Sequence, residues 1–202
     1  MIGLKYYYWF FKSALHKRTC EEIISIGNFH TRQKGIVQAE EQGKTSDASS
    51  IRNSTVKWLE DPWIYDQVLP YIRTANQNAG WNFDWDRSET MQLTHYRPGE
   101  FYSWHSDDYN EPFGESKHAN YRGKIRKLSV TVNLSDPSSY TGGEFELDLR
   151  NNPSGRNIIT VDEAAEQGTI LVFPSFVTHQ IRPVRSGERM SLVLWNLGPP
   201  WK

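Results

Sequence analysis

The feature that most limits what this chain can fold into is the residue pattern of positions 81–197. Apolar and polar residues alternate there in short runs that are separated by turn residues. Leu128 to Leu134 is a strong example, and Gly142-Gly143 precedes another run at Glu144 to Leu147. Alternation with a period of two is typical of strands that bury one face. Many short strands at regular spacing therefore predict an antiparallel barrel or jelly roll.

Residues 1–80 have a different pattern, which predicts supporting elements. The aromatic-rich residues 4–12 are expected to form a strand, and Thr19 is expected to cap a helix that ends near Gly27. Asp61-Pro62 is a typical helix start, and apolar residues follow it at helical spacing. The predicted fold class is mainly β with N-terminal helices, packed on a core of the double-stranded β-helix (jelly-roll or cupin-like) type.

Length and composition favour one globular domain. With 202 residues, residues 1–202 are expected to form a single domain, in which about 1–80 support a core of about 81–197. Lys and Arg (23) nearly balance Asp and Glu (24), so the charge gives no footprint for nucleic acid. The single cysteine cannot form an intramolecular disulfide. The apolar N-terminal run is too short to cross a membrane and lacks a signal-peptide cleavage site, so a soluble, cytoplasmic protein is expected.

A His-x-Asp motif at the end of a strand-like run is the main candidate for chemistry. Because side chains at i and i+2 of a strand project the same way, His105 and Asp107 can direct an imidazole nitrogen and a carboxylate oxygen at one point. Two such groups hold a metal poorly, and His179 is the best candidate for a third ligand. Two imidazoles and one carboxylate with open positions opposite them suit a non-haem Fe(II) oxygenase. Taken alone, the motif is equally compatible with a surface His–Asp pair.

Arg189 and Ser191 interrupt an otherwise apolar strand, and both are expected to face the barrel interior. A turn at 185–188 is expected to bring their strand back beside the strand that carries the third histidine. A buried guanidinium without an anionic partner is very costly. The partner is either an internal acid, Glu144 or Glu146, or the carboxylate of a ligand, which a planar guanidinium binds through two parallel hydrogen bonds.

The order of these motifs strongly resembles the Fe(II)- and 2-oxoglutarate-dependent dioxygenases and, among them, the prolyl 4-hydroxylase branch. The resemblance covers about residues 90–197. It is carried, in chain order, by Tyr96-x-x-Gly99-x-x-Tyr102-x-Trp104-His105-x-Asp107, Gly142-Gly143-Glu144, His179 with Pro183-Val184, Gly187 and Arg189-x-Ser191. The cofactors that it implies are Fe(II), with 2-oxoglutarate and O2 as cosubstrates, and ascorbate.

The resemblance also implies roles for the residues that match the family motifs. His105, Asp107 and His179 correspond to the iron ligands. Arg189 corresponds to the residue that binds the C5 carboxylate of 2-oxoglutarate, for which the collagen-type enzymes use lysine, and Ser191 is placed to assist it.

Aromatic and polar residues around these positions receive further roles from the same resemblance. Tyr96 matches a tyrosine whose hydroxyl lies beside the cosubstrate, and Tyr102 and Trp104 would line the pocket near the metal unless they only pack in the core. Prolyl hydroxylases often place another tyrosine on the strand at 129–133. This chain lacks it, which leaves Thr131 or Asn133 to contact 2-oxoglutarate.

The activity implied is hydroxylation of a C–H bond with release of succinate and CO2, with a prolyl residue of a protein or peptide as the expected substrate. Related halogenases lack the carboxylate ligand, so Asp107 favours hydroxylation. The alternatives are the same chemistry on a free amino acid or other small molecule, and a non-catalytic cupin-like binding module. The module is disfavoured because a structural metal site would fill its open positions. The expected partners are thus a proline-containing peptide or a small molecule, and neither nucleic acid nor a membrane.

Overall fold

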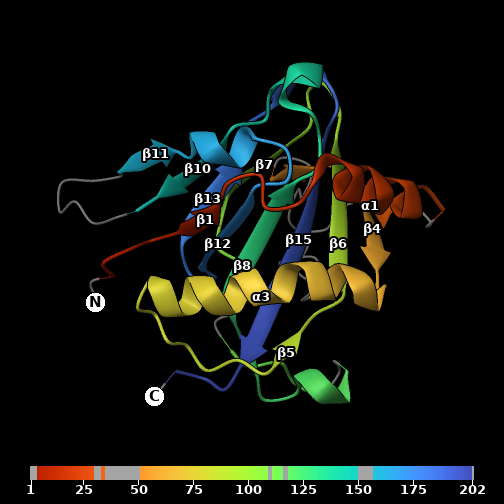
Figure 1. Ribbon diagram of the computed structural model, residues 1–202. Helices are drawn as coiled ribbons and strands as arrows, with labels where there is room; N and C mark the ends of the chain where they lie inside the picture. The colour runs from red at the N-terminus through yellow and green to blue at the C-terminus, as the bar shows by residue number, and fades with distance from the viewer. Residues whose placement is uncertain are drawn as a thin grey trace.

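The computed structural model describes residues 4–29, 33–34 (backbone only), 51–108, 111–115, 118–149 and 157–201, and Figure 1 shows their arrangement. The largest sheet has eight strands in the order β1-β12-β8-β15-β6-β4-β2, with β5 also paired to β15. A second sheet has five strands in the order β11-β10-β13-β7-β3, and β14 pairs with β9. All of these pairings are antiparallel.

The strands follow the alternating runs of the sequence closely. Those of the large sheet are β1 (Trp9–Phe11), β2 (Gln33–Lys34), β4 (Thr55–Leu59), β5 (Arg87–Ser88), β6 (Met91–Tyr96), β8 (Ile125–Asn133), β12 (Ile170–Pro174) and β15 (Arg189–Gly198). Those of the second sheet are β3 (Arg52–Asn53), β7 (Phe101–His105), β10 (Phe145–Asp148), β11 (Ile158–Thr160) and β13 (Thr178–Ile181), and the remaining pair is β9 (Tyr140–Gly142) and β14 (Val184–Gly187).

Two α-helices cover one face of the large sheet (Figure 1). They are α1 (Lys17–Phe29) and α3 (Pro62–Asn78), and short 3-10 helices lie at η2 (Ala119–Tyr121), η3 (Pro137–Ser139) and η4 (Asp162–Ala165). In α3, Ile64, Val68 and Ile72 recur at helical spacing and are fully buried. They join a core cluster with outward-facing residues of the sheet, including Leu192 and Leu194. This apolar layer packs the two helices on one face of the large sheet. The other face of the large sheet is directed toward the second sheet.

The prediction of a mainly β chain with helices in its N-terminal part is confirmed, with local corrections. The first helix begins at Lys17, so Thr19 lies inside its first turn and is not its cap. Residues 83–86, which alternate in sequence, form no strand. The Asn76 side chain takes both backbone groups of Phe83, donating to its carbonyl and accepting from its N–H, and the Asp86 N–H donates to the Leu197 carbonyl.

The expected neighbourhood of Arg189 is wrong in one respect. Its strand, β15, pairs with β8, β6 and β5 in the large sheet, whereas His179 lies on β13 of the second sheet. The reason is that residues 184–187 are not a simple turn. They form β14, which pairs with β9 and carries the chain from one sheet to the other. The two residues therefore approach the interior from opposite sheets.

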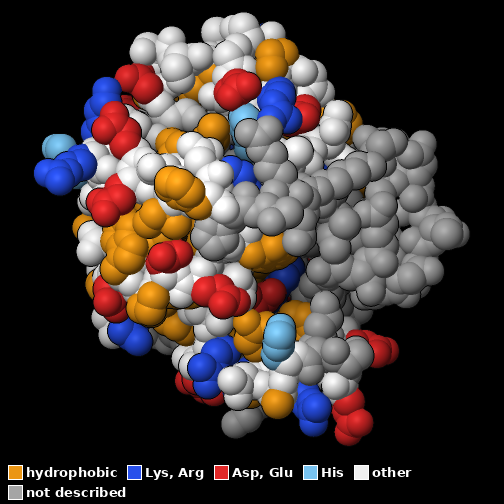
Figure 2. Space-filling view, turned by 90° about the vertical axis from the view of Figure 1, so that its right-hand side faces the viewer, with side chains coloured by type: hydrophobic (Ala, Val, Ile, Leu, Met, Phe, Trp, Pro, Cys, Tyr) orange, Lys and Arg blue, Asp and Glu red, His pale blue; other side chains and the backbone are white. Residues whose placement is uncertain are grey.

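Charged side chains are distributed without a large patch of one sign on the face in Figure 2, where Lys and Arg alternate with Asp and Glu. Within the described part of the chain, no helix combines the length and hydropathy needed to cross a bilayer. The polar residues 40–50, whose composition is typical of a surface loop, lie outside the described residues.

Candidate functional site

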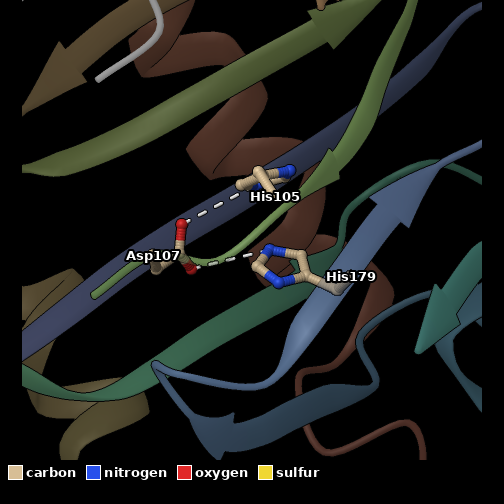
Figure 3. A group of neighbouring side chains, drawn as sticks. All are labelled: His105, Asp107 and His179. Atoms are coloured by element: carbon tan, nitrogen blue, oxygen red, sulfur yellow. Dashed lines mark ion pairs between the residues drawn. The ribbon is translucent and has the colours of Figure 1, made fainter. Parts of the chain in front are cut away.

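Three predicted ligand residues meet between the two sheets. His105 is the last residue of β7 and Asp107 follows two positions later, while His179 lies on β13 directly opposite His105. Figure 3 shows both rings projecting toward the carboxylate. The Nε2 atom of His105 lies 3.7 Å from Asp107 Oδ1, and that of His179 lies 3.6 Å from Oδ2. All three ligand atoms lie within 4.8 Å of one another.

Backbone carbonyls orient the two imidazole rings. His105 Nδ1 lies 2.7 Å from the Ser103 carbonyl, and His179 Nδ1 lies 3.0 Å from that of Val177. A ring nitrogen that donates to a carbonyl carries the proton, which leaves Nε2 with its lone pair. Both Nε2 atoms face Asp107, so the rings are held in the tautomer that binds a metal.

Burial and neighbouring charges shift the pKa values of His105 and Asp107. Burial, together with the neighbouring His179, lowers the pKa of His105 to about 3, so the ring is neutral at physiological pH. Burial alone would raise the pKa of Asp107, but the two histidines, Arg126 and a hydrogen bond from Ser129 hold that pKa below its ordinary value. Neutral imidazoles and an ionised carboxylate are the forms that coordinate Fe(II). The donor set therefore fits the metal.

A bulge in β7 shapes the wall beside this group. His105 lies opposite His179 and Tyr102 lies opposite Ile181, so four residues of β7 span three of β13. The bulge brings Tyr102 and His105 to the same side. Their rings stack with centroids 3.5 Å apart and planes at 11°. Trp104, which was expected beside them, is not among the described residues that line the cavity.

Arg189 is almost completely buried, with 1% of its surface exposed. Its Nη1 donates to Ser191 Oγ at 3.3 Å, and its guanidinium lies 5.8 Å from the centre of the Tyr96 ring. Among the described residues it forms no ion pair. The two internal acids considered from sequence are engaged elsewhere: Glu144 pairs with Arg185 at 2.8 Å, and Glu146 accepts from Gln180 and lies 3.9 Å from Arg182. In the described part of the chain, the guanidinium is thus a buried cation without an acidic counterion.

The other predicted cosubstrate residues differ in position. Tyr96, Thr131 and Ser191 line the cavity between the sheets. Asn133 is fully buried and instead donates through Nδ2 to the carbonyls of Ala165 at 2.6 Å and Ser135 at 3.1 Å. Its amide nitrogen is therefore committed to the backbone of its own surroundings.

Several residues that line the cavity were not predicted from the sequence. Arg52, Gln92 and Trp195 line the cavity, and Trp195 buries an indole N–H that has no hydrogen-bond partner in the described part of the chain. Trp195 could have been found, because it continues the inward-facing alternation of Arg189 and Ser191. Arg52 and Gln92 gave no such signal, because their place depends on which strands pair.

Comparisons with known proteins agree with this geometry. Residues 91–196 match the model of the 2OG-Fe(II) oxygenase superfamily. A PKHD-type hydroxylase of Maricaulis maris is 35% identical over 133 residues, which are 64% of this chain and 53% of that protein. A PKHD-type hydroxylase of Sphingopyxis alaskensis is 34% identical over 152 residues, which are 73% and 63% of the two chains. The chain thus spans about half the length of the first relative and less than two thirds of the second.

Solved structures show the same fold at low identity. The viral collagen prolyl hydroxylase of Paramecium bursaria Chlorella virus-1, in its 2-oxoglutarate complex, aligns with a TM-score of 0.64 and 19% identity over 96% of this chain and 97% of that one. A prolyl-4-hydroxylase of Pseudomonas putida gives 0.62 and 20% over 95% and 92%. These likenesses show that the facing sheets form a double-stranded β-helix. Because the family model covers more than half of its residues, the chain belongs to the 2OG-Fe(II) oxygenase superfamily, on the branch that resembles prolyl hydroxylases.

Proposed function

We propose that this chain catalyses Fe(II)- and 2-oxoglutarate-dependent hydroxylation of a C–H bond, with release of succinate and CO2, and that its substrate is a prolyl residue of a protein or peptide. One observation carries the proposal. Arg189 is buried and has no acidic partner among the described residues, and it contacts Ser191, which lines the same cavity as the His-Asp-His group. Such a cation is stable only if a bound anion completes it, and a dicarboxylate that also chelates a metal meets that need.

In this proposal, one group of side chains binds the metal and another binds the cosubstrate. His105, Asp107 and His179 hold Fe(II), which when bound supplies open positions for 2-oxoglutarate and O2. Arg189 and Ser191 bind the distal carboxylate of 2-oxoglutarate, which orients the keto acid toward the metal.

The remaining walls keep the reaction away from water. Tyr102 covers one side of His105, and Phe145 and Phe173 pack against His179 with ring centroids at 5.6 and 4.7 Å. Tyr96 and Thr131 line the cavity on the side of the large sheet. A dry, shaped cavity is the main contribution of a protein to chemistry of this type.

Three supports favour a prolyl substrate. The curated relatives are named PKHD-type hydroxylases, and the two aligned structures are prolyl hydroxylases. A third, the prolyl hydroxylase of Trichoplax adhaerens in complex with a hypoxia inducible factor peptide fragment, aligns with a TM-score of 0.63 and 14% identity over 95% of this chain and 84% of that one. We further propose that residues 1–202 act as one catalytic domain and that ascorbate supports turnover by keeping iron reduced.

Succinate production by purified protein tests the proposal. Protein with Fe(II), 2-oxoglutarate and ascorbate is offered proline-containing peptides in one series and free proline in another. Peptide-stimulated succinate together with an oxygen atom added to proline supports the full proposal. Stimulation by free proline alone refutes the peptide substrate and keeps the oxygenase.

Two variants separate catalysis at the site from background oxidation. His179→Ala removes a proposed ligand, and His16→Ala removes an exposed histidine far from the cavity lining. The proposal expects no succinate from the first and full activity from the second. Equal succinate from wild type and His179→Ala would refute the assignment of the site.

A further inference from the structure

A partly buried ion pair lies against the proposed metal site without belonging to it. Arg126 is on β8, and Glu89 is in the link between β5 and β6. Nε of the arginine lies 2.5 Å and Nη2 lies 2.8 Å from the two carboxylate oxygens, so the pair is bidentate. Each side chain is 11% exposed. Two hydrogen bonds in parallel fix the plane of the guanidinium as well as its position.

The fixed guanidinium contacts two parts of the site. Its Nη1 donates to the backbone carbonyl of Asp107 at 3.3 Å, and its central carbon, Cζ, lies 4.0 Å from the ring centre of Trp195. Glu89 also binds Trp195 directly, because its N–H donates to the Trp195 carbonyl at 2.9 Å. The pair therefore joins a proposed ligand to a wall of the cavity.

Asp107 depends on such contacts because it lies beyond the end of β7, where no strand pairing holds its backbone. Its N–H donates to the Ser175 carbonyl at 2.9 Å. Its carboxylate accepts a hydrogen bond from Ser129, whose hydroxyl also lies 2.9 Å from that of Ser175. Arg126 secures the remaining side of the residue, its carbonyl.

The positively charged Arg126 could compete with a metal for the Asp107 carboxylate, and its pairing with Glu89 prevents this. A guanidinium next to Asp107 would readily form a bidentate pair with that carboxylate and withdraw it from a metal. In this structure Glu89 accepts from Nε and Nη2 of the guanidinium, and Nη1 donates to the Asp107 carbonyl.

We infer that Glu89 and Arg126 are positioning residues: Glu89 holds Arg126 on the backbone of Asp107 and thereby leaves the Asp107 carboxylate free for the metal. The inference rests on the proposed function, because it assumes a metal at the His-Asp-His group. Outer-shell partners of metal ligands typically change metal affinity by about 10- to 100-fold, so the pair is expected to matter on that scale.

Binding of Co(II) to the full chain under anaerobic conditions tests this role without relying on turnover. The dissociation constant and the visible ligand-field spectrum are measured for wild type and for Glu89→Gln, which keeps the size of the side chain and removes its charge. We expect roughly tenfold or greater weakening and a changed spectrum. In Glu89→Gln with Arg126→Met, the competing cation is gone, and part of the affinity is expected to return.

Two controls separate positioning from general damage. Asp86→Asn removes the same charge from a neighbouring pair with Lys124, at 2.6 Å, that is 63% exposed on the aspartate side. Leu192→Ala weakens the helix-facing core without touching the site. Both are expected to bind Co(II) with the wild-type affinity and spectrum.

The outcomes distinguish this inference from the function on which it rests. Wild-type protein that binds Co(II) no better than Asp107→Ala would refute the metal site itself. Normal wild-type binding with unchanged affinity in Glu89→Gln would refute only the positioning role. That role would also be refuted if Leu192→Ala, at equal loss of stability, weakened Co(II) binding as much as Glu89→Gln.

Discussion

The two faces of β15 differ in what they bury. On the helix side, Leu192 and Leu194 join the core beneath α1 and α3. On the cavity side, Arg189, Ser191 and Trp195 are equally buried, yet they are polar or carry a polar group. Burying apolar surface stabilises a fold, whereas burying unpaired polar groups destabilises it. The helix side of the strand therefore maintains the structure, and the cavity side is arranged for a ligand.

Arg126, which is partly buried, and Arg189, which is almost completely buried, repeat this difference. Arg126 has an internal carboxylate in Glu89, and Arg189 has only the Ser191 hydroxyl among the described residues. A paired arginine is part of the scaffold, while an arginine without an acid is complete only when an anion binds. The comparison shows that charge pairing, rather than burial, distinguishes Arg189, the proposed binding residue, from Arg126.

Removing a proposed ligand should give the largest effect. In Asp107→Ala, turnover and Co(II) binding are expected to disappear while the apo protein stays folded, because the helix-facing core is untouched. Succinate assays, Co(II) titration and circular dichroism measure the three properties. A less stable Asp107→Ala protein that kept its turnover would contradict the assignment of the cavity side to catalysis and of the helix side to stability.

Arg189→Leu should separate binding from stability. Loss of one partner of a buried charged contact typically costs about 2–5 kcal/mol of binding, so the KM for 2-oxoglutarate should rise steeply. The free energy of unfolding without ligand should not fall, since a buried cation without an acid disappears. Steady-state kinetics and urea unfolding check both. Arg185→Leu, which removes an exposed guanidinium paired with Glu144, is the matched control and should leave the KM unchanged.

Leu192→Ala should have the opposite profile. Truncating a fully buried leucine typically costs about 2–5 kcal/mol of unfolding free energy. The KM for 2-oxoglutarate should remain at its wild-type value, because the residue faces the helices. Val193→Ala, one position along and only half buried on the cavity side, should cost less stability. Urea unfolding of the pair measures the difference, and equal losses would contradict the assignment of faces.

Changing the pH should affect the stability of the metal-free protein less than these substitutions do, and the change should be gradual. His105 titrates near 6.5 when unfolded and near 3 when folded, so below about pH 6.5 the unfolded chain binds more protons. Stability should therefore fall as the pH drops from about 6.5 toward 3, by at most about 1.4 kcal/mol per pH unit from this residue. Asp107, whose pKa is lowered, adds loss of the same sign at more acidic pH.

Urea unfolding of metal-free protein between pH 7.5 and 4.5 measures this slope. His105→Asn should flatten it by the contribution of one histidine. An identical slope in that variant would show that His105 is not held neutral in the folded chain.

Short-range rules account for the parts of the site that were predictable. The i, i+2 relation placed His105 with Asp107 and Arg189 with Ser191, and the same alternation extends to Trp195. The relation between strands was not predictable in this way. Whether β15 pairs with β13 or β8 depends on tertiary packing, and residues 184–187 formed a strand where a turn was expected. The Glu89–Arg126 pair joins segments distant in sequence, so only the folded register reveals it.

Anaerobic titration of the Fe(II)-loaded protein with 2-oxoglutarate tests the central claim most directly. Chelation of iron by the keto acid produces a visible charge-transfer absorption, which reports binding without substrate or turnover. We expect a saturable band in wild type that needs far more 2-oxoglutarate in Arg189→Leu. Absence of the band in wild type, or equal saturation in both proteins, would contradict it.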